Sequence, residues 1–197
     1  LKILTYNIHG LPGVFLKDNP NMRIPIISEK INNYDISLIQ EDFSHHNKLL
    51  SNLDKNSLVF RGYSMVNLSC PFCINSGLTT ITNLPEDWKI EVENKKFKNC
   101  SGWLMGTNDC FANKGFQIIK ITIKNNKKFF IVNTHINAGG RDSDRCAREK
   151  QLEYIIATIK EKNITEPLII AGDLNLNSNN TKDVLLLEKF KTELQLK

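Results

Sequence analysis

Short apolar segments of strand length recur along this chain, and a small polar cluster stands at the end of each of five of them. The apolar segments favour buried strands, and the polar residues beside them are the side chains available for chemistry. The chemistry of the chain is therefore expected where its strands stop. The clusters are Thr5-Tyr6-Asn7, Ile39-Gln40-Glu41-Asp42, Ala112-Asn113-Lys114-Gly115, Asn133-Thr134-His135 and Ala171-Gly172-Asp173-Leu174-Asn175.

Strands and helices alternate along the sequence, with no repeat and no low-complexity segment. Residues 115–124 and 128–136 alternate in side-chain character, so they should pair as a hairpin around Asn125-Asn126. Residues 142–162 predict the longest helix, with Asp142 or Ser143 as its N-terminal cap. This order predicts an α/β sandwich of two packed sheets covered by helices. Further strands are expected at 3–8, 35–40, 63–68, 77–82, 88–93 and 168–171, and further helices at 23–33, 45–53 and 181–190.

Length and composition set broad limits. A chain of 197 residues with 41% hydrophobic content can bury a substantial core, and nothing in its composition requires a second domain. We therefore expect one domain over residues 1–197 and a monomer. The net charge of +5 is spread over many lysines, so it favours anionic partners weakly and does not separate nucleic acid from a lipid headgroup. No apolar run approaches the roughly 18 residues that cross a bilayer, so no transmembrane segment is expected.

Five cysteines bear on the redox compartment. The histidines are not at ligand spacing and only one C-x-x-C pair exists, which argues against a structural zinc site. Disulfides in an oxidising compartment fit better: Cys100 with Cys110 around a loop, and Cys70 with Cys73 as a local bridge, leaving Cys146 over. An intracellular protein with free thiols is the alternative.

The first residue, Leu1, leads directly into a strand-like segment. We expect that an upstream piece was removed, and a cleaved secretion signal would fit. The predicted location is secreted or periplasmic, with the cytoplasm as the alternative.

Taken together, the five clusters resemble the endonuclease/exonuclease/phosphatase superfamily, which includes DNase I-like nucleases, inositol phosphatases and bacterial sphingomyelinases. The resemblance runs from Leu1 to about Leu187 and implies a four-layer α/β sandwich of two mostly antiparallel sheets. It also implies hydrolysis of a phosphodiester with Mg²⁺, or Mn²⁺ or Ca²⁺, as cofactor. Such hydrolysis needs a cation on a phosphate oxygen, a positioned water and donors that follow the developing charge.

The resemblance assigns a role to each cluster. Glu41 would bind the metal, and Asn7 would orient the metal or the phosphate. His135 would bind the phosphate or assist the leaving group. Asp173 would hold or activate the attacking water, and Asn175 would donate hydrogen bonds to the transition state. Each residue alone has a plainer explanation, such as a solvated strand end or an Asx turn; their conjunction in this order favours the site.

Two segments resemble the secreted, sphingomyelinase-like branch. One is Cys100-Ser101-Gly102-Trp103 with the stretch from Asp109 to Gly115, where Asn113 and Lys114 would lie near the substrate phosphate. The other follows His135 and places Arg145 and Arg148 on one helical face. These arginines are candidates for anionic headgroups and peripheral membrane contact, although pairing with Glu149 or Asp144 on a solvated face is the alternative.

The superfamily closes with an Asp-His pair on a C-terminal strand, yet no histidine follows His135. We therefore expect a domain that lacks its C-terminal strands. Three functions remain open: a divalent-metal phosphodiesterase acting on a phospholipid, a DNase I-like endonuclease, and a catalytically inactive phosphate-binding module. A nuclease would need a groove of basic residues, and the basic residues here are scattered.

Overall fold

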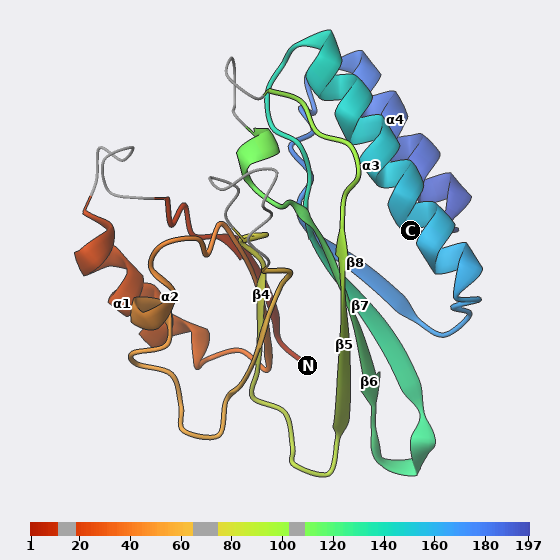
Figure 1. Cartoon of the computed structure of the whole chain (residues 1–197). Coiled ribbons are helices and arrows are strands. Elements are labelled where there is room, and N and C mark those ends of the chain that lie inside the picture. Colours follow the sequence, from red (N-terminus) through yellow and green to blue (C-terminus); the bar gives the residue numbers. More distant parts are fainter. Residues whose placement is uncertain (12–18, 65–74, 103–108) are drawn as a thin grey trace.

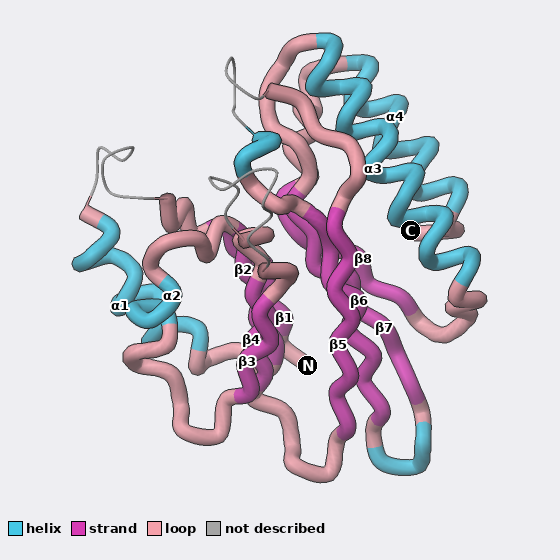
Figure 2. The backbone as a smooth tube through the Cα atoms, in the orientation of Figure 1, coloured by secondary structure: helices cyan, strands magenta, loops and turns pink. Residues whose placement is uncertain are grey.

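The computed structural model describes residues 1–11, 19–64, 75–102 and 109–197. Two four-stranded sheets stack face to face, and helices cover their outer faces (Figures 1 and 2). The fold is thus the expected α/β sandwich of two mostly antiparallel sheets. One sheet has the order β1 (Ile3–Asn7), β2 (Ile36–Gln40), β4 (Thr79–Thr82), β3 (Leu58–Arg61), and the other the order β5 (Lys89–Lys96), β6 (Gly115–Thr122), β7 (Lys128–His135), β8 (Leu168–Asp173).

The helices lie on opposite sides of this sandwich (Figure 1). Those on the β1–β4 side are α1 (Pro20–Ile31) and α2 (His46–Leu49), and those on the other side are α3 (Asp142–Glu161) and α4 (Thr181–Glu193). Short 3₁₀ turns occur at η2 (Asp109–Phe111) and η3 (Lys124–Asn126). No helix among the residues described is both long and apolar enough to span a bilayer.

The alternating pattern of β6 explains how the layers are joined. Phe116 and Ile118 pack outward with α3 and α4, whereas Ile119 and Ile121 face the other sheet and contact Ile36 and its neighbours. The predicted hairpin is confirmed, because β6 and β7 pair antiparallel. Burial of both faces of one strand makes it the centre of the fold.

Two local predictions were wrong. The third strand is Leu58–Arg61 rather than 63–68, where residues 63 and 64 are not strand and 65–68 lie outside the described residues. The long helix is capped by neither Asp142 nor Ser143: its N-cap is Arg141, whose backbone N–H donates to the Asp144 carboxylate at 2.9 Å. A carboxylate at the third helical position satisfies an otherwise free N–H, which the cap prediction did not consider.

The Cys100–Cys110 disulfide is present, and Cys146 is an exposed free thiol, as expected. The predicted Cys70–Cys73 bridge lies outside the described residues.

Candidate active site

The two parallel strand pairs bring the predicted site residues to one edge of the sandwich. β1 runs parallel to β2, so Asn7 lies opposite Gln40, next to Glu41. In the other sheet β7 runs parallel to β8, so His135 lies opposite Asp173. The strands β1 and β8 contact each other across the layers. Four carboxyl-terminal strand ends therefore converge, each carrying a polar residue.

Asn7 joins the two carboxylates of this cluster. Its amide nitrogen donates to Glu41 Oε1 at 2.8 Å and to Asp173 Oδ2 at 3.0 Å. Its amide oxygen accepts from the His9 N–H at 2.9 Å. Asn7 therefore links two carboxylates that come from different sheets.

His135 completes the cluster. Its Nε2 atom lies 3.9 Å from Glu41 Oε1, 4.0 Å from Asp173 Oδ2 and 3.1 Å from Lys114 Nζ. Burial, and then the positive charge of Lys114, hold the pKa of His135 well below its usual value of 6.5. The imidazole is therefore neutral at physiological pH and does not form ion pairs with the two carboxylates.

Lys114 is enclosed. Its ammonium group contacts Asp109 Oδ1 at 3.0 Å, His135 Nε2 at 3.1 Å and the Ile136 carbonyl at 3.0 Å. Burial lowers the pKa of Lys114, while the Asp109 carboxylate opposes that shift. Asn113, the other predicted phosphate residue, is buried beside it in the chain. The three ammonium protons of Lys114 point to protein partners in this structure.

Glu41 stands in an uncommon backbone conformation, with φ at 58°. Its carbonyl accepts from the N–H groups of Gly10 (3.0 Å) and Phe43 (2.9 Å), and a Cβ on Gly10 would lie 2.6 Å from that oxygen. Left-handed backbone at a non-glycine residue costs on the order of 1–3 kcal/mol and persists where its surroundings impose it. In this backbone conformation the Glu41 carboxylate lies against Asn7 and His135.

Asp173 and Asn175 differ in backbone conformation and in hydrogen-bond partners. β8 ends at Asp173, and Asn175 lies beyond it with φ at 47°, so the two-residue spacing does not place both side chains on one side of an extended strand. Instead the Asn175 N–H donates to Asp173 Oδ1 at 2.9 Å, the Asx turn of the plainer explanation. The Asn175 side chain donates to the Ile136 carbonyl at 2.9 Å, which Lys114 also contacts.

A buried polar layer between the sheets lies directly behind the site. Gln40 Nε2 donates to Asn133 Oδ1 at 2.8 Å, Asn133 Nδ2 donates to Gln117 Oε1 at 3.2 Å, and the Thr80 hydroxyl donates to the same Gln117 oxygen at 2.8 Å. Gln40 immediately precedes Glu41 and Asn133 lies two residues before His135, but sequence reasoning gave neither a role. The signal in the sequence was an amide side chain within each of two mostly apolar strands, because a buried amide needs hydrogen-bond partners.

Sequence reasoning also gave no role to Asp42, whose carboxylate is buried. The Asp42 carboxylate accepts from the Thr79 hydroxyl at 2.7 Å and contacts His46 Nδ1 at 2.5 Å. His46 therefore belongs to the support of the Glu41 segment and does not reach the central cluster. Asp109 was missed as well, because its ion pair with Lys114 depends on tertiary folding.

Arg148 has neither environment predicted for the helical arginines. Arg148 is fully buried, donates to the carbonyls of Asn137 and Gly139, and pairs with Asp183 at 3.4 Å. It is therefore neither a headgroup contact nor part of a solvated face. Arg145 pairs with Asp142 at 3.0 Å.

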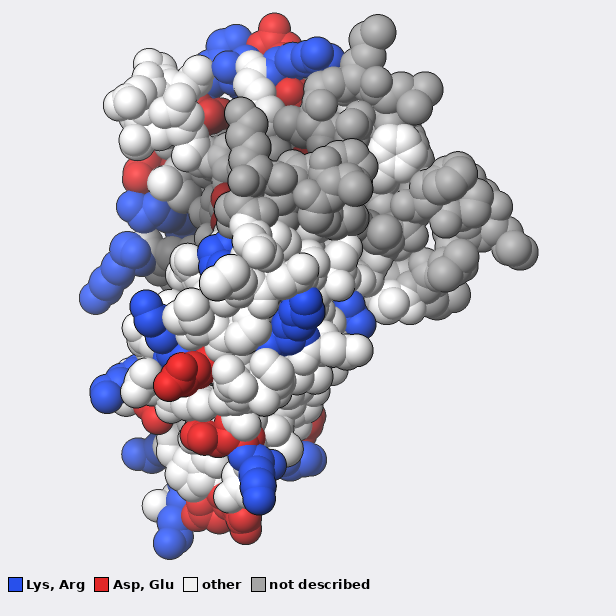
Figure 3. Space-filling model, turned by 90° about the vertical axis from the view of Figure 1, so that its left-hand side faces the viewer, with Lys and Arg blue, Asp and Glu red and all other residues white. Residues whose placement is uncertain are grey.

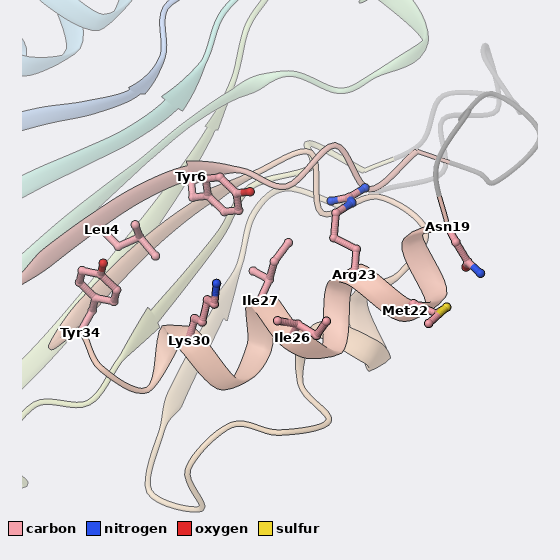
Figure 4. Close-up of a pocket in the computed structure, with 9 residues that line it drawn as sticks. All are labelled: Leu4, Tyr6, Asn19, Met22, Arg23, Ile26, Ile27, Lys30 and Tyr34. Atoms are coloured by element: carbon pink, nitrogen blue, oxygen red, sulfur yellow. The ribbon is translucent and has the colours of Figure 1, made fainter.

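The pocket of about 600 Å³ drawn in Figure 4 is separate from this cluster. Side chains of α1 and β1, among them Ile27, Lys30, Leu4 and Tyr6, line it, and it contains neither a carboxylate nor a histidine. We therefore place the chemistry at the strand ends and not in this groove.

The central cluster fits a divalent cation with an incomplete protein shell. Glu41 Oε2 is buried and has no hydrogen-bond partner. An unpaired carboxylate oxygen beside a second carboxylate is costly without a cation. Within the described ranges, no group of three or more histidine, cysteine, aspartate or glutamate side chains is arranged to hold a metal ion. Mg²⁺ needs only one or two carboxylates and keeps several waters, so the Glu41 and Asp173 carboxylates are a sufficient donor set for it. Asn7 presents its amide nitrogen to both carboxylates.

Comparison with known proteins agrees with this fold. The model of endonuclease/exonuclease/phosphatase family 2 matches residues 5–195. Sphingomyelinase C 2 of Leptospira interrogans is 30% identical over 218 aligned positions, covering 94% of this chain and 32% of its own length. The sphingomyelinase of Mycobacterium tuberculosis is 22% identical, covering 93% and 36%. The chain thus spans about a third of the length of these relatives.

Solved structures give the same result. A beta toxin structure from Staphylococcus aureus superposes with a TM-score of 0.79 at 27% identity, covering 97% of this chain and 71% of the toxin chain. A variant of that toxin with bound magnesium ions gives 0.77 at 25% identity, covering 98% and 69%.

Fold and site together define an α/β sandwich of the DNase I-like kind. The chain belongs to endonuclease/exonuclease/phosphatase family 2, in its sphingomyelinase-like branch.

Proposed function

We propose that this protein is a divalent-metal-dependent phosphodiesterase that hydrolyses the phosphodiester of a phospholipid such as sphingomyelin. The observation that carries the proposal is the meeting of Asn7, Glu41, His135 and Asp173, where Asn7 and His135 lie at Glu41 Oε1 and Glu41 Oε2 is buried without a hydrogen-bond partner. Mg²⁺ is the proposed ion, and the magnesium bound to a related toxin supports that choice. We also propose that residues 1–197 belong to a single domain.

Glu41 would hold the cation through Oε2. Asn7 would bind the cation through its amide oxygen, which accepts a hydrogen bond from the His9 N–H in this structure. The bound cation would neutralise charge on a phosphate oxygen. Asp173, whose Oδ2 is held by Asn7, would orient the water that attacks phosphorus. The neutral His135 would stand beside the phosphate and hold the Lys114 ammonium group there, since its Nε2 atom lies 3.1 Å from Lys114 Nζ and 3.9 and 4.0 Å from the two carboxylates.

A phospholipid is preferred to DNA because the relatives are named sphingomyelinases and because charge on the surface is mixed. Figure 3 shows basic and acidic side chains interspersed over the described part of one face. Duplex binding depends on neutralising several phosphates with clustered lysines and arginines. The Cys100–Cys110 disulfide supports a location outside the reducing cytosol, either secreted or periplasmic.

The test is a substrate panel with and without metal. Purified protein would be assayed for release of phosphocholine from sphingomyelin in mixed micelles and for nicking of supercoiled plasmid, each in Mg²⁺ and in EDTA. Hydrolysis of sphingomyelin should require Mg²⁺ and disappear in Asp173→Asn, while the exposed control Glu29→Gln keeps it.

Three results would change the assignment. Metal-dependent nicking without lipid hydrolysis would make the protein a nuclease. Binding of Mg²⁺ without turnover of either substrate would make it a phosphate-binding module. Full sphingomyelin hydrolysis by Asp173→Asn would show that the assigned site is wrong.

A further inference from the structure

A buried chain of polar groups runs from Asp109 to the catalytic cluster. Asp109 Oδ1 lies 3.0 Å from Lys114 Nζ, and Lys114 Nζ lies 3.1 Å from His135 Nε2. All three side chains are buried. A charged lysine in such a place is stable only with a paired acid. Asp109 supplies that acid.

Asp109 is itself fixed from two directions. Its other oxygen, Oδ2, accepts from the backbone N–H of Ala138, in the loop that follows His135. Its neighbour in the chain, Cys110, is bonded to Cys100, and the N–H of Ser101 donates to Asn137 Oδ1 at 2.8 Å. The loop that carries Asp109 is thus attached to the segment that carries the histidine.

The lysine determines which imidazole nitrogen is protonated. A lysine ammonium group has only donors, so His135 Nε2 must accept from it, and the ring proton then sits on Nδ1. Nδ1 is buried and makes no hydrogen bond within the described structure. Metal-site and catalytic histidines usually have their tautomer set by a partner on the far nitrogen. Among the described residues Nδ1 has no such partner, so the contact of Nε2 with Lys114 sets the tautomer.

We propose that Asp109 is a positioning residue that, through Lys114, holds His135 in the tautomer with its proton on Nδ1 and its Nε2 toward Glu41 and Asp173. Loss of the Asp109 charge leaves Lys114 buried without an acid, which disfavours the charged form of Lys114. A neutral lysine can accept a hydrogen bond, so His135 Nε2 could then carry the ring proton. The same lysine contacts the Ile136 carbonyl that also receives Asn175. Asp109 therefore acts on His135 through Lys114 and has no direct contact with it.

The test is ¹⁵N spectroscopy of the histidine side chains at neutral pH in EDTA. The chain has four histidines, so His135 can be assigned by its loss in His135→Gln. Wild type should show a protonated-type shift at Nδ1 and an unprotonated-type shift at Nε2. In Asp109→Asn the two shifts should move toward each other as the other tautomer appears. Lys114→Met, which removes the donor altogether, should give the same change if Asp109→Asn folds poorly.

The matched control is Asp183→Asn, which removes the acid of the other buried pair, with Arg148. It should lower stability and leave the His135 shifts unchanged. Unchanged His135 shifts in Asp109→Asn and Lys114→Met would overturn the proposal, as would an equal change in Asp183→Asn.

The effect on catalysis rests on the proposed function. Asp109→Asn should lower kcat for sphingomyelin by about 10- to 100-fold with little change in KM, the usual cost of losing such an outer partner. If wild type hydrolyses no phosphodiester, the proposed function fails while the spectroscopic result still decides the role of Asp109. A changed tautomer with unchanged kcat would overturn its catalytic importance.

Discussion

The Glu41 carboxylate and the His135 imidazole face each other at 3.9 Å (Oε1 to Nε2), although Glu41 follows β2 in one sheet and His135 ends β7 in the other. The site therefore exists only when the two sheets stack in one register. Residues between the sheets should govern activity as well as stability.

Asn133→Leu tests this dependence. The substitution takes partners from Gln40 and Gln117 in the buried layer, so it should lower the free energy of unfolding by about 1–3 kcal/mol. Urea denaturation measures the change. The exposed control Asn56→Leu should stay within about 0.5 kcal/mol of wild type. A neutral effect of Asn133→Leu would show that the layer does not hold the sheets together.

Gly172→Ala should be strongly destabilising. Gly172 has φ at 136°, and an added Cβ would lie 1.9 Å from the Thr134 carbonyl oxygen in β7. The strain would separate β7 from β8 next to His135 and Asp173, at a cost of at least about 2 kcal/mol. Gly140→Ala is the comparison, since a Cβ there meets nothing within 4 Å. Equal unfolding free energies for the two variants would contradict the geometry.

The disulfide gives a third test. Replacing both Cys100 and Cys110 by serine should lower the free energy of unfolding by ~3 kcal/mol, because the bridge closes a short loop in the unfolded chain. The free thiol Cys146→Ser should change it by no more than about 0.5 kcal/mol. Calorimetric melting of the two variants beside wild type measures both effects. A double variant as stable as wild type would show that the disulfide does not stabilise the fold.

Stability should fall in mild acid because of His135. The folded pKa of His135 lies below 6.5, so as pH falls the unfolded chain takes up the proton first. The contribution is therefore present above pH 6.5 and is lost as pH drops toward the folded pKa. In EDTA, the unfolding free energy of wild type should decline more steeply than that of His135→Gln between about pH 7.5 and pH 5. Parallel curves would mean that His135 titrates normally when folded.

Much of the architecture followed from local pattern. The alternation along residues 115–124 predicted a strand that pairs in a hairpin, and the structure adds that its two faces, at Ile118 and Ile119, lie in different cores. Strand 58–61 was missed because its four residues carry little alternation, and pairing with β4 rather than local preference makes it a strand.

The positions of the site residues could be predicted from strand ends, but their contacts could not. Nothing in the sequence around Asn7 tells whether its amide presents nitrogen or oxygen to a carboxylate. The pairing of Lys114 with Asp109 and the burial of Arg148 depend on loops and helices that meet only in the folded chain. Long-range electrostatics of this kind leave no periodic pattern to read.

The central claim is that Glu41 binds the catalytic cation, and calorimetric titration of Mg²⁺ into the metal-free protein tests it most directly. Wild type should bind one ion per chain, as should the exposed control Glu29→Gln. Glu41→Gln keeps the side-chain volume but loses the charge and the unpaired oxygen, so its affinity should fall by more than about tenfold. Equal Mg²⁺ affinity in wild type and Glu41→Gln would contradict the account.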